Sequence, residues 1–212
     1  MELLALFLNS FVIGFSGAMM PGPLLAVDIA ETPHHGWRTG PVITVGHAIA
    51  EIGVVVVLAF GVAAVASHPA VARTIGVVGG LELLIMGGMM AYDTLRRRIS
   101  YDVSSSGKPA GYRLAGKGIT ASISNPYWFV WWVTVGLALL VQAQGFGWIG
   151  PVVFYFGHIL SDFVWYTVVS VLLWNGRKLF MGTGLKVLLL VCATFLVYLG
   201  GKFIFNGVTG KM

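Results

Sequence analysis

Long apolar runs separated by short polar stretches dominate this chain. Each run has about 20 residues and very few charges, and an α-helix of that length crosses a hydrocarbon core of about 30 Å. The pattern predicts six membrane spans: Leu3–Met20, Val42–Val65, Val71–Ala91, Gly118–Val141, Ile149–Trp174 and Leu185–Phe205. Because these spans use nearly the whole length, the predicted fold class is an all-α membrane protein of six transmembrane helices.

The composition supports a membrane protein and excludes several other classes. Of the 212 residues, 57% are hydrophobic and 10% are charged, whereas soluble domains carry about 25% charged residues. So few charges could not cover a water-soluble surface, which excludes a cytosolic enzyme domain, a disordered chain and a nucleic-acid binder. The single Cys192 cannot form an internal disulfide. We expect membrane lipid as the surroundings and no cofactor.

The basic residues are unevenly distributed between the two sides that six spans create. One side receives ten of the thirteen: Arg38, Arg96, Arg97, Arg98, Lys108, Arg113, Lys117, Arg177, Lys178 and Lys186. Cytoplasmic loops hold the excess of Lys and Arg, so we expect a multi-pass protein of the inner (cell) membrane with both termini outside. Only Glu2 is charged before the first run, so that run lacks the basic start of a signal peptide and is expected to stay as the first span.

The two halves of the chain resemble each other. Residues 40–51 read GPVITVGHAIAE and residues 150–162 read GPVVFYFGHILSD, and the first and fourth runs both break at proline. The chain therefore divides into a three-helix repeat at 1–93, a cytoplasmic linker at 94–117 and a second repeat at 118–212. An odd number of spans per repeat inverts the second one, and inverted repeats with broken helices are typical of transporters that bind substrate near the midplane.

Carboxylates inside predicted spans are costly and usually face a cavity or a partner. His47 and Glu51 share one helix face, as do His158 and Asp162, because each pair is four residues apart. The four side chains could exchange protons, hold a substrate ammonium group or bind a divalent metal ion. Alternatively, each histidine simply pairs with the acid on its own helix. For two further intramembrane acids, Asp28 and Glu82, function and structural pairing stay equally open.

Prolines mark where the first and fourth spans cannot continue as regular helix. Pro21, Gly22 and Pro23 interrupt the first, and Asn125 and Pro126 interrupt the fourth, where Asn125 can cap the next helix. The N-terminus of a half-helix attracts an anion such as a substrate carboxylate. We therefore predict these residues as substrate-binding, together with Glu51 and Asp162, with a packing kink as the alternative.

Two other clusters have both a functional and a structural interpretation. The aromatic run Tyr127–Trp132 falls near the middle of its span, so Trp128 is predicted either to line the pocket or to serve packing alone. Glycines of the third span give it a small-residue face that suits close helix contact or a homodimer seam. These glycines are Gly76, Gly79, Gly80, Gly87 and Gly88.

Several of these motifs resemble the lysine-exporter (LysE-type) translocator family. They are the PGP break at 21–23, then Gly36, Trp37, Arg38 and Gly40 before the second span, then Ser124, Asn125 and Pro126 in the fourth. The resemblance covers nearly the whole chain. It implies an inner-membrane exporter of amino acids or related small solutes, driven by the proton gradient. The paired Gly-His-x-x-x-acid blocks depart from typical amino-acid exporters, and the wider superfamily includes heavy-metal exporters.

The sequence therefore predicts a secondary transporter that exports a small-molecule substrate by proton antiport with alternating access. Glu51, Asp162, His47 and His158 are the predicted proton-coupling residues. The alternative is a divalent-metal exporter that uses the same four side chains as ligands. An intramembrane hydrolase or a non-transporting subunit is a third class. Neither H-E-x-x-H nor G-x-S-x-G occurs in the sequence, so we do not expect an enzyme.

Overall fold

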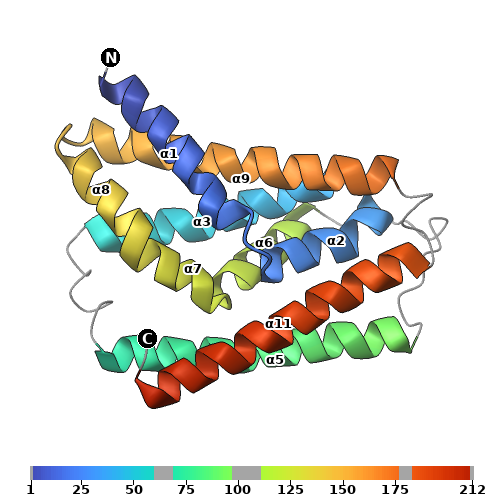
Figure 1. Ribbon diagram of the computed structural model, residues 1–212. Coiled ribbons are helices and arrows are strands. Elements are labelled where there is room, and N and C mark those ends of the chain that lie inside the picture. Colours follow the sequence, from blue (N-terminus) through green and yellow to red (C-terminus); the bar gives the residue numbers. More distant parts are fainter. Residues whose placement is uncertain (1, 60–68, 97–110, 177–182, 211–212) are drawn as a thin grey trace.

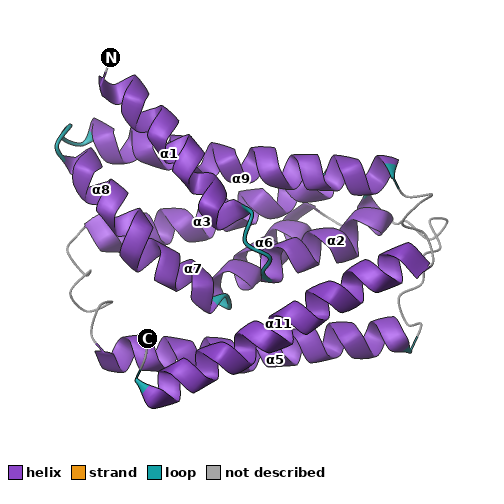
Figure 2. Ribbon diagram, in the orientation of Figure 1, coloured by secondary structure: helices purple, strands orange, loops and turns teal. Residues whose placement is uncertain are grey.

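The computed structural model describes residues 2–59, 69–96, 111–176 and 183–210, and every regular element within these ranges is helical (Figures 1 and 2). The N-terminal part of the chain contains α1 (Glu2–Ala18), α2 (Pro23–His35), α3 (Thr39–Val57) and α5 (Pro69–Leu95). The C-terminal part contains α6 (Gly111–Ile123), α7 (Pro126–Trp131), the π-helical turn η3 (Trp132–Gly136), α8 (Leu137–Gln144), α9 (Ile149–Asn175) and α11 (Thr183–Thr209).

The predicted break in the first span separates α1 from α2. The two helices meet at 78°, and the connecting loop is visible between them in Figure 2. Gly22 is the N-cap of α2 in an extended conformation, and Pro23 takes the first helical position, where its missing amide hydrogen leaves no helical bond unmade. The PGP sequence therefore ends one helix and starts the next in a different direction.

The predicted break in the fourth span separates α6 from α7. Asn125 is the N-cap of α7, as its position before Pro126 predicts, and its Oδ1 accepts a hydrogen bond from the Tyr127 amide at 3.0 Å. Helix α6 begins at Gly111, so helical structure extends into the stretch predicted as a linker. Residues 97–110 of that stretch lie outside the described residues.

Several of the described helices are long and apolar enough to cross a membrane. Four qualify by themselves, namely Thr39–Val57, Pro126–Gln144, Ile149–Asn175 and Leu189–Thr209, and the bent pair α1 and α2 can form a fifth span. A multi-pass helical membrane protein is therefore confirmed. The predicted third span, Val71–Ala91, lies within the 27 residues of α5, several of whose side chains lie outside the described residues, so six spans stay a prediction.

Glycines allow the helices around the centre of the molecule to approach closely. A Cβ at Gly46 of α3 would lie 1.8 Å from the Ala115 carbonyl oxygen of α6, and one at Gly118 of α6 would lie 2.0 Å from the Ile43 oxygen. Small residues at such contacts are the usual basis of helix packing in membranes. The two backbones are therefore in direct contact, which fixes His47 on α3 next to α6.

Helices α5 and α11 pack along each other on one side of the molecule (Figure 1). Gly80 and Gly87, two of the glycines predicted for close helix contact, face α11, because a Cβ at either would lie 2.8 Å from a backbone oxygen of that helix. At Gly88 a Cβ would meet nothing within 4 Å. At Gly80 and Gly87, the small-residue face of α5 thus serves packing within the chain.

Candidate functional site

A pocket lies where the two helix breaks meet. A Cβ at Gly22 would lie 3.2 Å from Asn125 Nδ2, so the break before α2 is next to the break before α7. The cavity volume of the pocket is about 40 Å³. It is lined by Gly17, Met20, Gly22, Leu24, His47, Glu51, Ala121, Ser122, Asn125, Tyr127, Trp128, Trp131, His158, Asp162 and Tyr166.

The carboxylate of Glu51 is the centre of the polar groups in this pocket. The indole N–H groups of Trp128 and Trp132 donate to its Oε1 from 3.2 and 3.1 Å. The Nε2 atoms of His47 and His158 each lie 3.1 Å from the same oxygen. Glu51 is 1% exposed, and a buried carboxylate is stable only where donors or cations surround it. Nitrogen groups from three helices, α3, α7 and α9, and from η3 supply that environment.

Asp162 lies on the other side of the two imidazoles. Its Oδ1 is 3.7 Å from His47 Nε2, and its Oδ2 is 3.7 Å from His158 Nε2. These separations exceed hydrogen-bond length, so the Asp162 carboxylate is held less tightly than that of Glu51. Asp162 Oδ2 and Glu51 Oε2 both lack a hydrogen-bond partner among the described residues, but only Asp162 has no imidazole within hydrogen-bond distance, so Asp162 is the acid with more freedom to hold another ligand.

Aromatic rings fix the position of His158. Its ring stacks on Trp131 with centroids 4.5 Å apart and meets the edge of Trp132 at 5.3 Å. Trp131 in turn donates its indole N–H to Ser16 Oγ of α1 at 3.1 Å. The aromatic run predicted as either pocket wall or packing therefore does both, since its rings line the pocket, donate to Glu51 and hold His158.

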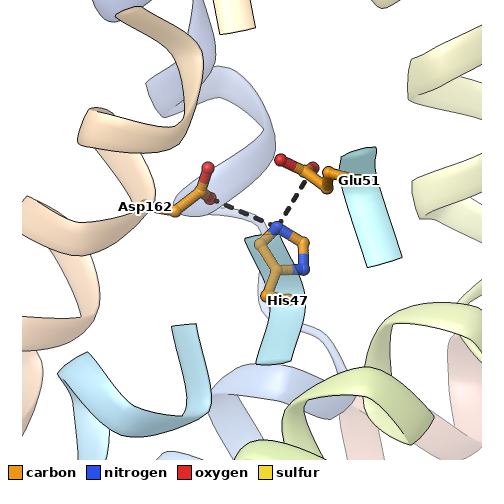
Figure 3. Close-up of side chains that lie close together, drawn as sticks. All are labelled: His47, Glu51 and Asp162. Carbon is orange, nitrogen blue, oxygen red and sulfur yellow. Dashed lines mark ion pairs between the residues drawn. The ribbon is translucent and has the colours of Figure 1, made fainter. Parts of the chain in front are cut away.

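The hydrogen bonds of Ser122 define which nitrogen of His47 carries a proton. The Ser122 hydroxyl donates to the Gly118 carbonyl oxygen at 2.7 Å, and its oxygen lies 2.6 Å from His47 Nδ1. A serine hydroxyl has a single hydrogen, so it must accept from an Nδ1–H group. In neutral His47 the lone pair is then on Nε2, which points between Glu51 and Asp162 (Figure 3).

That arrangement requires a positive charge between the histidine and the acids. A lone pair aimed at two carboxylates is repelled by both, whereas a proton or a metal ion between them is attracted to all three groups. His47, Glu51 and Asp162 each offer a ligand atom within 4.8 Å of the others, which is a candidate metal-binding group. The geometry therefore suits the reversible binding of a proton or of a small cation.

The structure brings most of the predicted site residues to one place. Gly22, Asn125 and Trp128 line the pocket together with the four predicted proton-coupling residues, His47, Glu51, His158 and Asp162. Pro21, Pro23 and Pro126 are not in the lining and act on the pocket through the helix breaks. Asp28 lies in a different cluster, and the side chain of Glu82 lies outside the described residues.

Sequence reasoning missed three residues of the site. Trp132 donates to Glu51, Ser122 orients His47, and Tyr166 lines the pocket one helical turn after Asp162. Trp128 and Trp132 are four residues apart and share a helix face, so the sequence spacing could have predicted that Trp132 lies next to Trp128 in the site. The serine has no such signal, because it depends on α6 lying directly against α3.

The two half-helix ends differ in their capacity for an anion. The amide of Tyr127, at the start of α7, is already bonded to the Asn125 side chain at 3.0 Å. Gly22 has no side chain with which to cap α2, whose first amides therefore have no side-chain acceptor. A ligand carboxylate in the pocket thus finds the better donors at the start of α2.

Comparison with known proteins gives one match. Residues 15–207 match the model of a family described as "LysE type translocator", and this range covers most of the chain. None of the curated proteins compared with the chain matches it, and no solved structure does.

Proposed function

The chain belongs to the LysE type translocator family, and on that premise we propose that it is a secondary transporter that exports an amino acid or related small solute by proton antiport. The family is one of transporters, so the protein is not expected to catalyse a reaction. The observation that carries the proposal is the position of His47, whose Nε2 faces two buried carboxylates across the pocket.

The polar cluster has the chemistry of a proton-coupling site. Two imidazoles lie between two carboxylates, and an imidazole gains or loses a proton near neutral pH. A proton entering the cluster reduces the negative charge that holds a substrate cation, so proton binding and substrate binding oppose each other. Opposed binding at one site is what an antiporter needs.

Different groups of the pocket suit the two ends of an amino acid. The uncapped amides at the start of α2 would bind the carboxylate. Asp162, whose oxygens lie 3.7 Å from the imidazole nitrogens, would bind the ammonium group. Glu51 would stay with the imidazoles, because its Oε1 already receives four nitrogen groups. Trp128 and Trp131 supply aromatic walls next to that ammonium.

Alternating access would come from movement of one inverted repeat against the other. The packing of the helices supports this proposal, because α1 packs on α9 and α6 packs on α3. In each proposed repeat, the first half-helix therefore contacts the second span of the other repeat. Helices α5 and α11 run in opposite directions, as do α3 and α9 (Figure 1). We place the protein in the inner membrane with both termini outside.

Acid-to-amide variants test the coupling mechanism. Purified protein in proteoliposomes would be offered a panel of amino acids, with ΔpH-driven accumulation and counterflow measured separately. Glu51→Gln and Asp162→Asn are expected to lower ΔpH-driven accumulation by more than tenfold, because a side-chain amide does not take up a proton in the pH range of the transport assay. Glu2→Gln, which removes an exposed acid on α1, should transport like the wild type. Unchanged accumulation in both pocket variants would disprove the mechanism.

A divalent-metal exporter is the second candidate, and the ligand group of His47, Glu51 and Asp162 favours it. The Nδ1–H of His47 is held by Ser122, which leaves Nε2 as the ligand atom. Metal-binding histidines typically have their other ring nitrogen fixed in this way. His158 lies outside this three-residue group, although it contacts Glu51 at 3.1 Å.

Calorimetric titration with Co²⁺ and Ni²⁺ separates the two candidates. A metal exporter should bind one of these ions, release protons on binding, and lose at least tenfold in affinity in His47→Gln, because metal ligands must be deprotonated. The same variant should abolish metal transport in proteoliposomes. Binding that is equal in the wild type and in His47→Gln would rule out this site for the metal.

A further inference from the structure

A second buried carboxyl lies outside the pocket. Asp28 of α2 is fully buried. Its Oδ1 accepts hydrogen bonds from the Ser170 hydroxyl at 2.5 Å and the Thr32 hydroxyl at 2.8 Å. The Ser170 oxygen also accepts the Gly40 amide hydrogen at 2.7 Å. Asp28 therefore connects α2 to α9 directly and to the start of α3 through one serine.

No cation balances this carboxyl. Across the residues that the structure describes, no ion pair includes Asp28, and its Oδ2 is buried without a hydrogen-bond partner. Two basic groups, His35 of α2 and Lys117 of α6, pair with Glu31 instead, at 3.2 Å and 2.6 Å. An ionised carboxylate that is buried without a cation is disfavoured, and the two hydroxyl donors offset only part of that cost, so this conformation favours protonation of Asp28 more than an exposed site would.

The other titratable groups near Asp28 do not change that conclusion. On α9, Tyr166 and Asp162 lie one and two turns before Ser170, and an ionised Asp162 would disfavour a second negative charge further. The contact from α3 is the Gly40 backbone. From α11, Cys192 packs with Ile29 in an apolar cluster. None of these groups supplies a positive charge.

We propose that Asp28 is a second proton-binding site of the transport cycle, which keeps its proton while α2 packs on α9 and releases it when α2 moves away. The proposal rests on the proposed function for the movement of α2. Helix α2 follows the 78° break, which is where the proposal places the hinge for this movement. Separation from α9 would remove Ser170 and admit water, and water stabilises the ionised acid.

The hydrogen bonds favour a proton over a sodium ion as the ligand. Ser170 donates its hydrogen to Asp28, and one lone pair of its oxygen is used by the Gly40 amide. The Thr32 hydroxyl also directs its hydrogen at Asp28. A sodium ion needs oxygen lone pairs directed at it, whereas here two hydroxyl hydrogens point at the carboxyl. The missing positive charge is therefore one proton.

A buried row of polar side chains connects Asp28 with the pocket. Asp162, Tyr166 and Ser170 follow each other at four-residue spacing on one face of α9, and their exposed fractions are 2%, 4% and 0%. The first two line the pocket, and the third holds Asp28. The row runs toward the end of α9 at Asn175, the end that the distribution of basic residues assigns to the cytoplasm. Asp28 thus lies on the predicted cytoplasmic side of the pocket.

Infrared difference spectroscopy of the full purified chain tests the bound proton directly. At mildly acidic pH the wild type should show a protonated-carboxyl C=O band that is absent in Asp28→Asn and weakens as the pH is raised. Ser170→Ala, which keeps the acid and removes one donor to Oδ1, should shift the band. Glu2→Gln should leave it unchanged, because that acid is exposed on α1. A wild-type spectrum identical to that of Asp28→Asn, or a band displaced by sodium ions at constant pH, would overturn the proposal.

Transport in proteoliposomes with L-lysine as the probe gives the second measurement. Asp28→Asn should retain lysine counterflow and lose at least tenfold in ΔpH-driven accumulation, because a fixed neutral amide can neither bind nor release a proton. Equal accumulation in this variant and the wild type would overturn the role of Asp28 in the cycle. A wild type that does not transport lysine would count against the proposed substrate class, and the infrared band would still decide whether Asp28 holds a proton.

Discussion

The indole of Trp132 illustrates how single residues determine the chemistry of the pocket. It is fully buried, and its N–H group reaches Glu51 Oε1 at 3.1 Å, while its ring lies at 81° to the ring of His158. The spacing of His47 with Glu51, and of His158 with Asp162, was enough to predict that these side chains share helix faces. It could not predict Trp132 as a donor, because the rotation of η3 relative to α3 depends on packing.

Replacement of Trp132 by phenylalanine keeps most of the ring and removes the donor. We expect Trp132→Phe to lower the free energy of unfolding by about 1–3 kcal/mol, because a hydrogen bond to a charged group is lost. Thermal unfolding in detergent would measure the change. Trp148→Phe is the matched control, since Trp148 is 82% exposed. An equal effect of both substitutions would show that the indole N–H of Trp132 contributes nothing specific.

Among the elements, α3 is the one most closely fitted to its surroundings. It carries His47 and Glu51, and its Gly46 lies so close to α6 that a Cβ would fall 1.8 Å from the Ala115 oxygen. The same contact brings Ser122 of α6 to His47. Sequence patterns predicted both helices and the break after α6. They could not predict this contact, because glycines are frequent in apolar helices with and without close neighbours.

A pair of glycine variants on α3 tests the contact. Gly46→Ala should destabilise the protein by about 1–3 kcal/mol, as overpacking of a close-packed interior does, and should also impair transport by moving α6 away from His47. Gly53→Ala on the same helix should be neutral or slightly stabilising, because a Cβ there meets nothing within 4 Å. Unfolding curves of both variants in detergent give the comparison. Equal stability of the two would contradict the close approach of α3 and α6.

For the whole molecule, the main consequence concerns the orientation of the chain in the membrane. The first described residues of α1 and the last of α11 lie toward the same end of the molecule (Figure 1), which agrees with an even number of crossings. The excess of basic residues predicts that the opposite end faces the cytoplasm. The exposed Arg113, at the start of α6, belongs to that opposite end, and the exposed Thr209 belongs to the end of the termini.

Cysteine labelling in intact cells tests this orientation. In a Cys192→Ala background, a membrane-impermeant maleimide should label Thr209→Cys from outside and should label Arg113→Cys only after the membrane is permeabilised. The reverse pattern would place the termini in the cytoplasm. Labelling of both positions from outside would contradict the odd number of crossings predicted between them.

The sequence by itself determined the membrane setting, the helical class and the places where the helices break. Those features depend on local physics: the length and polarity of each run, the missing amide of proline and the capping by Asn125. It also determined that each histidine shares a helix face with an acid. Only the tertiary structure decided that both pairs meet around Glu51, that Ser122 orients His47, and that Asp28 is buried without a cation. These relations join residues far apart in the chain, so they depend on how the helices rotate and cross, which hydropathy does not encode.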